Sequence, residues 1–527
     1  MRRSLLIATL ACALPAIGCA QAVQAPAASG PTLLVFVTVD QLRPDYFMRF
    51  EGQLSGGLAR LYRGGAFYTN AVHDHAITET APGHAATMSG RFPRSTGIVE
   101  NAAGVGDPDS PLIGGGGPGA SPHRFRGTVL TDWILRKNPQ ARALSVSRKD
   151  RGAILPMGRL KQSVFWYAGT GDFTTSTYYR DTLPEWVRQF NARQVPAQSA
   201  GNAWTLLLDE SQYPEPDDVP QENAGRGGVT FPHLVPLDSA RAAAVFPAFP
   251  WMDEHTLQFA LAGLEALKLG EGPGTDVLAI SLSTTDAVGH AYGPDSRELH
   301  DHILRLDQYL GAFFDSLYKV RDSSRVIVAL TADHGVAPYP GVKSRDPNGD
   351  AGYAREALET GWAMEARVAA ALGDSTQFIW SPPMLLMNRS ALSAKRVSPD
   401  SVVRVFMNAM KRAPGIARVD RLRDLARADT TRDWIARRWL HSMPPGLPVE
   451  VVVTLKPYHY WGAGPATHGT PYDYDARVPV IFYGPPFKAG KFDELARVVD
   501  MAPTLASALD VSPTEALDGR VLKSAFR

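Results

Sequence analysis

The chain has 527 residues, with 54 basic and 53 acidic side chains and a formal net charge of +1. This length can bury a large core, and an apolar content of 44% excludes an intrinsically disordered chain. No block of basic residues stands out, so the charge gives no case for nucleic acid as a partner.

Residues 1–22 predict a secretory signal peptide, because two arginines precede an apolar run and the small residues "AQA" offer a cleavage site after Ala22. The apolar run is too short for a stable membrane span. The alternative, a lipid anchor at Cys19 in "AIGC", has alanine where leucine is usual. We therefore expect a periplasmic or secreted protein. Its mature chain would lose both cysteines, Cys12 and Cys19, so a metal site would need His, Asp and Glu ligands.

Apolar runs that begin near residues 31, 143, 276, 324 and 477 predict the strands of a sheet. Helical periodicity lies between and after them, at 253–270, 296–320 and 498–511. This alternation predicts an α/β fold with an open, mostly parallel sheet flanked by helices. We expect one catalytic domain over 30–527, with inserted cap or subdomain segments at about 160–250 and 340–460, and a glycine- and proline-rich loop at 102–122.

Acids and histidines gather where the predicted strands end, which is where open α/β sheets place their sites. Each is weak evidence alone, because a strand-end aspartate is often only a cap or turn residue. Together they could hold two zinc ions with three protein ligands each. The set is Asp40, Asp286, His290, Asp333, His334 and His468. We expect His73, His75 and His84 to have packing or hydrogen-bonding roles instead.

The stretch "AITETAPGHAATMSG" (76–90) predicts a helix in which Pro82 takes the first helical position. Thr80 would then lie at the helix entrance, where free N–H groups and the helix dipole favour an anion. A hydroxyl that binds a metal ion can act as a nucleophile without a neighbouring base. Two alternatives stay open: Thr80 can be a plain N-cap, and Thr78 can take either role.

The T-x-P-x-H pattern at Thr80 and "GRFPRSTGIVEN", which ends in Asn101, resemble the alkaline phosphatase superfamily, and within it the type I phosphodiesterase/nucleotide pyrophosphatase group. The six metal-type residues occur in that family's order. "SRKDRGAILPMG" resembles a motif of the phosphate-irrepressible periplasmic alkaline phosphatases. The resemblance implies that Lys149 and Arg151 contact the phosphoryl group, whose several charged oxygens need cations and donors.

The resemblance implies an exported, zinc-dependent alkaline phosphatase that hydrolyses small phosphate monoesters through a phosphothreonine at Thr80. One zinc ion is expected on Asp40, Asp333, His334 and Thr80, and the other on Asp286, His290 and His468. Asn101, Lys149 and Arg151 would bind the phosphoryl group, and the protein is expected to be a monomer. The rivals are a phosphodiesterase or nucleotide pyrophosphatase on the same fold, and an inactive zinc-binding relative. A sulfatase is disfavoured, because His84 stands where that family has arginine.

Overall fold

The computed structural model describes residues 30–114, 117–222, 228–339, 352–462 and 466–527. The predicted signal peptide, with Cys12 and Cys19, lies outside these residues. Within them, no helix combines the length and the apolar character that a membrane crossing requires.

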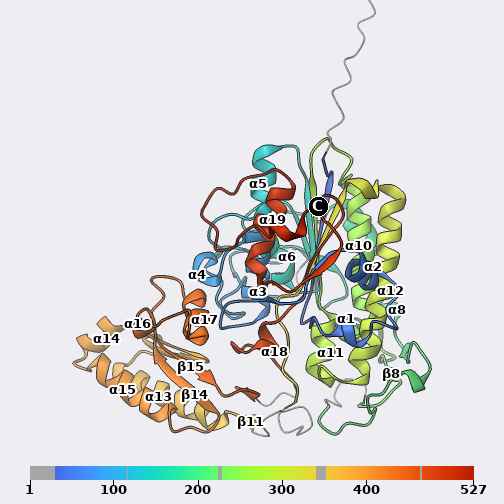
Figure 1. Ribbon diagram of the computed structural model, residues 1–527. Helices are drawn as coiled ribbons and strands as arrows, with labels where there is room; N and C mark the ends of the chain where they lie inside the picture. The colour runs from blue at the N-terminus through green and yellow to red at the C-terminus, as the bar shows by residue number, and fades with distance from the viewer. Residues whose placement is uncertain (1–29, 115–116, 223–227, 340–351, 463–465) are drawn as a thin grey trace, which may run out of the picture.

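A nine-stranded sheet forms the centre of the molecule (Figure 1). Its five middle strands are parallel, and the strands toward both edges include antiparallel neighbours. This architecture confirms the predicted open, mostly parallel sheet. In spatial order the strands are β18 (Gly490–Phe492), β2 (Ala66–Tyr68), β17 (Val480–Tyr483), β10 (Val326–Thr331), β1 (Leu33–Val39), β9 (Asp276–Leu282), β4 (Ala143–Ser147), β5 (Ser163–Tyr167) and β6 (Phe173–Thr174).

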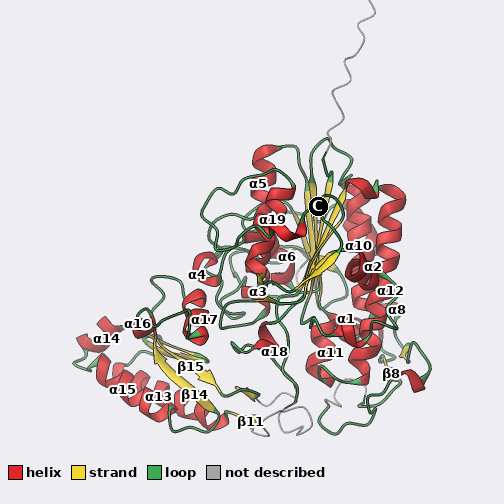
Figure 2. Cartoon of the chain, in the orientation of Figure 1, coloured by secondary structure: helices red, strands yellow, loops and turns green. Residues whose placement is uncertain are grey.

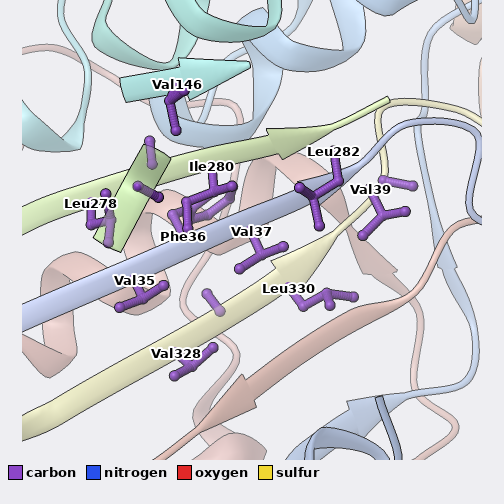
Figure 3. Close-up of a cluster of buried hydrophobic side chains, with 14 of the residues drawn as sticks. Val35, Phe36, Val37, Val39, Val146, Leu278, Ile280, Leu282, Val328 and Leu330 are labelled. Carbon is purple, nitrogen blue, oxygen red and sulfur yellow. The ribbon is translucent and has the colours of Figure 1, made fainter. Parts of the chain in front are cut away.

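The middle strands are continuous apolar runs because helices cover both faces of the sheet. Val35 of β1 lies in register with Val328 of β10 and with Leu278 of β9. Figure 3 shows these side chains, which are fully buried, packed among their neighbours. The core thus fixes the register of β1, β9 and β10, and with it the position of the residues that follow each strand.

Helices form a layer on each side of the central sheet (Figure 2). One layer contains α2 (Gly57–Gly64), α10 (Trp251–Ala266) and α12 (Arg297–Val320), and the other contains α3 (Thr80–Ser89), α5 (Leu130–Lys137), α6 (Asp150–Ile154) and α19 (Met501–Ala508). The remaining helices of this body are α1 (Tyr46–Arg49), α4 (Pro93–Thr96), α7 (Glu185–Asn191), α8 (Val195–Gln198), α9 (Ser239–Val245), α11 (Thr284–Tyr292) and α18 (Asp473–Ala476). Short strand pairs join β3 (Ala71–Val72) to β19 (Ala496–Arg497) and β7 (Ala203–Trp204) to β8 (His233–Leu234).

A second lobe is built between β10 and β17 of the chain, at the lower left of Figure 1. It has a four-stranded antiparallel sheet of β12 (Phe378–Ser381), β13 (Met384–Met387), β15 (Val449–Leu455) and β14 (Ile416–Arg421). Its helices are α13 (Arg355–Leu372), α14 (Arg389–Ala394), α15 (Pro399–Met410), α16 (Leu422–Leu425) and α17 (Trp434–Ser442), and β11 (Gly352–Tyr353) pairs with β16 (His459–Tyr460). The lobe has its own apolar core, which includes Phe378 and Phe406.

A separate apolar cluster joins the lobe to the body. Trp439 and Met384 of the lobe pack there with Ile77 and Val99, which flank α3 and α4. The stretch 160–250, which we expected to be inserted, also supplies β5 and β6 to one edge of the central sheet.

Candidate metal and phosphate site

The carboxyl ends of β1, β9 and β10 meet at one edge of the sheet because the three strands are parallel neighbours. Asp40 directly follows β1, Asp286 lies in the first turn of α11 after β9, and Asp333 follows β10. The N-terminus of α3 and the segment 466–470 complete the site. Residues that are hundreds of positions apart in the chain thereby come within contact distance.

Asp40, Asp333 and His334 form the first group of potential metal ligands. One donor atom from each lies within 4.8 Å of the others, and all three side chains are fully buried. His334 Nε2 is 3.4 Å from Asp40 Oδ1 and 3.5 Å from Asp333 Oδ2. This is the trio that the sequence predicts for one ion.

Asp286 and His468 form the second group, together with His334. The rings of His334 and His468 stack with their centroids 3.5 Å apart, so His334 lies between the two groups. The sequence predicts His290 as the third ligand here. His290 Nε2 is 3.1 Å from Asp286 Oδ1, and its side chain is 35% exposed, so it lies at the solvent side of the group.

The electrostatics of the site fit cations. Three buried carboxylates face one ammonium group, Lys149 Nζ, which is 2.6 Å from Asp40 Oδ2 and 2.7 Å from Asp286 Oδ2. Among the described residues, the buried Asp40 Oδ1 accepts no hydrogen bond. Buried negative charge that a single lysine balances only in part is costly, and oxygen and imidazole donors suit zinc. The residues present therefore fit the expected metal ions.

The pKa values follow from the same crowding. Burial, and then the negative charges of Asp286 and Asp333, raise the pKa of Asp40. Burial alone would also raise the pKa of Asp286, but the charges of Lys149 and then His290 outweigh it and hold that pKa well below its usual range. Burial would lower the pKa of His468, yet its hydrogen bond and charge interaction with Asp286 raise it to about 9. The site thus stabilises positive charge next to Asp286.

Thr80 is the first residue of α3, and Glu79 is its N-cap. The expectation that Pro82 takes the first helical position is wrong, because the helix begins two residues earlier and Pro82 stands at the third position. There its missing N–H still costs no intrahelical bond. The side chain of Glu79 makes no capping bond, and Thr80 Oγ1 lies 3.4 Å from Lys149 Nζ and 3.5 Å from His334 Nε2.

Thr78 has a different environment. Its hydroxyl donates a 2.8 Å hydrogen bond to the Thr470 carbonyl, and its own carbonyl oxygen is 2.8 Å from His468 Nδ1. Thr78 therefore orients His468 through its backbone, while its side chain is already used in a buried structural contact.

The predicted phosphate-binding residues differ in how close they come to Thr80. Asn101 Oδ1 accepts a 2.8 Å bond from the Ala81 N–H, which fixes the side-chain amide beside the start of α3. Lys149 contacts Thr80 directly, as described above. Arg151 is in the first turn of α6, and its Nη1 is 3.4 Å from Asp150 Oδ1. Arg151 is therefore paired with its neighbour rather than with Thr80.

Two residues that contact the predicted ligands were not predicted from the sequence. The Gln41 N–H donates to Asp333 Oδ1 at 3.1 Å, and its side-chain amide donates to Asp286 Oδ1 at 3.0 Å. Its φ of 67° is a left-handed conformation that few residues other than glycine adopt, and no sequence pattern announces it. Arg148 is partly buried near the site, 3.8 Å from Asp286 Oδ2.

The histidines that the sequence left out of the ligand set are buried in hydrogen-bonding or packing positions. His84 Nδ1 is 2.9 Å from the Thr80 carbonyl and 3.1 Å from Asp333 Oδ2, and its Nε2 is 2.9 Å from Ser281 Oγ. His73 Nε2 lies 2.9 Å from the Ala332 carbonyl, and its ring packs edge-on against His75. His84 was expected only to hydrogen-bond, but it also orients a carboxylate of the first group.

Comparison with known proteins shows the family of the chain. A family model described as type I phosphodiesterase / nucleotide pyrophosphatase matches residues 34–378. Alkaline phosphatase PhoV of Synechococcus elongatus is 30% identical over 513 residues, which cover 93% of this chain and 92% of that protein. Alkaline phosphatase PafA of Elizabethkingia meningoseptica is 29% identical over 514 residues, covering 91% and 92%.

Solved structures show the same architecture. The crystal structure of wild-type PafA superposes with a TM-score of 0.86 at 28% identity, covering 94% of this chain and 99% of that one. Murine ectonucleotide pyrophosphatase/phosphodiesterase 5 superposes with a TM-score of 0.52 at 14% identity, which is a likeness of fold alone. These matches confirm the resemblance inferred from the motifs and the predicted fold.

Proposed function

Because the chain belongs to the type I phosphodiesterase/nucleotide pyrophosphatase family, we propose that it is an exported, zinc-dependent phosphate monoester hydrolase that acts through a phosphothreonine at Thr80. Two relatives that match over nearly their whole length are alkaline phosphatases. The observation that carries the proposal is the position of Thr80 Oγ1, which lies 3.4 Å from a buried lysine at the junction of the two ligand groups.

Asp40, Asp333 and His334 would hold one zinc ion, and Asp286, His290 and His468 the other. When bound, the ions supply Lewis-acid charge that favours deprotonation of a hydroxyl and stabilises the oxygen of the leaving alcohol. His334 contacts Asp40 of the first group and stacks on His468 of the second, so it would hold the two groups side by side.

The remaining steps belong to the chain's own side chains. Lys149 Nζ donates toward Thr80 Oγ1 and stabilises negative charge there as the proton leaves. Thr80 Oγ1 forms a bond to phosphorus while the bond from phosphorus to the alcohol oxygen breaks, and the proton that Thr80 loses passes through solvent to that oxygen, so that the alcohol leaves neutral. Water then attacks the phosphothreonine, which releases inorganic phosphate and restores the threonine. Lys149, Arg151, the Asn101 amide and the Thr80 N–H at the start of α3 would bind the phosphoryl oxygens during both transfers.

The test is one assay series on the purified protein with an aryl phosphate monoester and the matching diester. We expect higher kcat/KM on the monoester, loss of activity after chelation, and recovery on adding zinc. Turnover of the diester equal to or above that of the monoester would overturn the monoesterase assignment. Activity that survives thorough chelation would overturn the metal requirement.

A phosphodiesterase is the second candidate, and the description of the matching family model favours it. A diester carries one negative charge fewer than a monoester, so it gains less from an added cation. Lys149 lies within reach of Thr80, which supports the monoester. If the diesterase is correct, replacing Lys149 should change diester turnover little.

A further inference from the structure

A cavity of about 410 Å³ opens beside the second ligand group. His290 and His468 line one side of it, and the lobe provides Pro382 and Leu455 on another. The segment that returns from the lobe to the body adds Tyr460 and Trp461. Body and lobe therefore build this cavity together, whereas the central sheet alone positions the ligand groups.

The cavity lies on one particular side of the site. The described residues that line it include two of the second ligand group, His290 and His468, but not Thr80, Lys149 or Asn101. In the proposed reaction Thr80 Oγ1, which lies 3.5 Å from His334 of the first group, attacks phosphorus, and the alcohol would depart in line on the opposite side, toward the second group with His290 and His468. The part of a substrate that would enter the cavity is thus the leaving group.

The aromatic wall of the cavity is held in place by contacts within the protein. The half-buried ring of Trp461 meets the buried ring of Trp380 at an interplanar angle of 77°, with centroids 5.6 Å apart. The Tyr460 hydroxyl donates a 2.9 Å hydrogen bond to the Ala337 carbonyl. A fixed aromatic surface binds a flat ring at low entropic cost, because neither side chain must be ordered on binding.

The charged residues of the cavity disfavour an anionic leaving group. Away from the side formed by His290 and His468, the charged residues that line the cavity are Glu79 and Asp475, and no lysine or arginine occurs among its described lining residues. Glu79 Oε2 accepts a 2.7 Å hydrogen bond from the Asn101 N–H, which holds this carboxylate beside the start of α3. A leaving group that carries further phosphates or carboxylates would meet like charge here.

We propose that this cavity is a leaving-group subsite, and that it selects phosphate monoesters whose leaving group is uncharged and carries a flat ring, such as a nucleoside or an aryl alcohol. The proposal rests on the proposed function and makes it narrower. Glu79, Tyr460 and Trp461 are the residues that set the preference.

The test compares adenosine 5′-monophosphate with glycerol 1-phosphate, since both esters release a primary alcohol and only one carries a ring. Trp461→Ala should lower kcat/KM on the adenosine ester about tenfold, the worth of one base stacked on an aromatic side chain. It should change kcat/KM on the glycerol ester less than twofold. Trp362→Ala is the control, because Trp362 lies on α13 of the same lobe, is 51% exposed and is not part of the cavity.

The charge is tested with ATP, whose leaving group is a nucleotide anion. Glu79→Gln keeps an acceptor for the Asn101 N–H, and it should raise the ratio of kcat/KM on ATP to that on adenosine 5′-monophosphate about fivefold, as expected for one nearby charge in water. Equal losses on both primary esters in Trp461→Ala, or an unchanged ratio in Glu79→Gln, would overturn the proposal.

A binding measurement separates this proposal from the proposed function. Adenosine, added to the zinc-loaded protein, should give saturation-transfer NMR signals in the wild type and in Trp362→Ala, and weaker ones in Trp461→Ala. If no monoester is hydrolysed but adenosine still binds through Trp461, the proposed function fails while the ring-binding cavity stands. If monoesters are hydrolysed but the adenosine signals are equally strong in the wild type and in Trp461→Ala, the subsite proposal fails and the proposed function stands.

Discussion

The side-chain amide of Gln41 donates a 3.0 Å hydrogen bond to Asp286, which is 245 positions away in the chain. The backbone N–H of the same residue donates to Asp333. One residue therefore orients a carboxylate in each of the two ligand groups. Gly289 makes this possible, because a Cβ at that position would lie 1.8 Å from Gln41 Oε1.

We predict that Gln41→Gly lowers zinc affinity about 10- to 100-fold, the usual effect of removing a partner that orients a metal ligand. Glycine accepts the left-handed backbone, so this variant removes the side chain without straining the chain. Zinc titration against a chelating dye measures the affinity. Gln194→Gly is the control, since Gln194 is also left-handed but lies exposed in a loop before α8. Equal zinc affinity in both variants would contradict the role of Gln41.

Thr80→Ala should abolish phosphomonoesterase activity, because it removes the proposed nucleophile. Thr78→Ala should keep activity and lose about 1 kcal/mol of unfolding free energy, since the Thr78 hydroxyl only donates to a buried carbonyl. Initial rates and denaturant titrations measure the two effects. The opposite result, an active Thr80→Ala and an inactive Thr78→Ala, would move the nucleophile to Thr78.

Lys149→Ala should lower kcat/KM on a phosphate monoester by about 10²–10³, by analogy with other donors that stabilise transition-state charge. The loss on the matching diester should be smaller, because less charge needs compensation. Lys137→Ala is a matched control on the surface, where this lysine pairs with Asp510. Equal losses on monoester and diester would show that Lys149 supports the ligand groups rather than the monoester dianion.

The buried carboxyl of Asp253 predicts how the free energy of unfolding depends on pH. Burial raises the pKa of Asp253 to about 7 against the opposing hydrogen bonds from Thr284. A carboxyl whose folded pKa is raised contributes stability that is present below its unfolded pKa of about 4 and is lost as the pH rises through about 7. Asp253→Asn should therefore be more stable than the wild type at pH 8, by up to about 4 kcal/mol, and gain little at pH 4.

Denaturant unfolding of the zinc-loaded protein at the two pH values checks this result. Asp510→Asn is the control, because Asp510 is 98% exposed and should change the pH dependence little. If Asp253→Asn follows the wild type at both values, burial does not control the ionisation of Asp253.

The sequence predicts the site residues that lie at fixed positions relative to the strands. Asp40, Asp286 and Asp333 could be placed together because each comes after an apolar run, and parallel strands bring such positions to one edge of a sheet. Gln41 could not be foreseen, since its role depends on a left-handed backbone and on space left by Gly289, two features that no periodicity records.

Spacing along the chain does not predict where a helix begins or which side chains pair in space. The T-x-P-x-H register made Thr80 the candidate nucleophile and predicted a helix that begins at Pro82. The helix instead begins at Thr80, because Glu79 is the cap and the proline is accepted in the first turn. That Lys149 would contact both Asp40 and Asp286 depends on the approach of α6 to β1 and β9. The pairing of Arg151 with Asp150, its neighbour in the sequence, is likewise decided by local rotamers.

The chain leaves the central sheet after β10 and returns to it at β17, and the lobe lies between these two points. The ligands from β1, β9 and β10 precede this excursion, and His468 follows it. Mutations within the lobe can therefore accumulate without moving the strand ends that carry the carboxylates. If the lobe residues of the cavity select the leaving group as proposed, a lineage can change its substrates through the lobe while the ligand groups stay the same, which makes the lobe the natural segment to exchange between relatives.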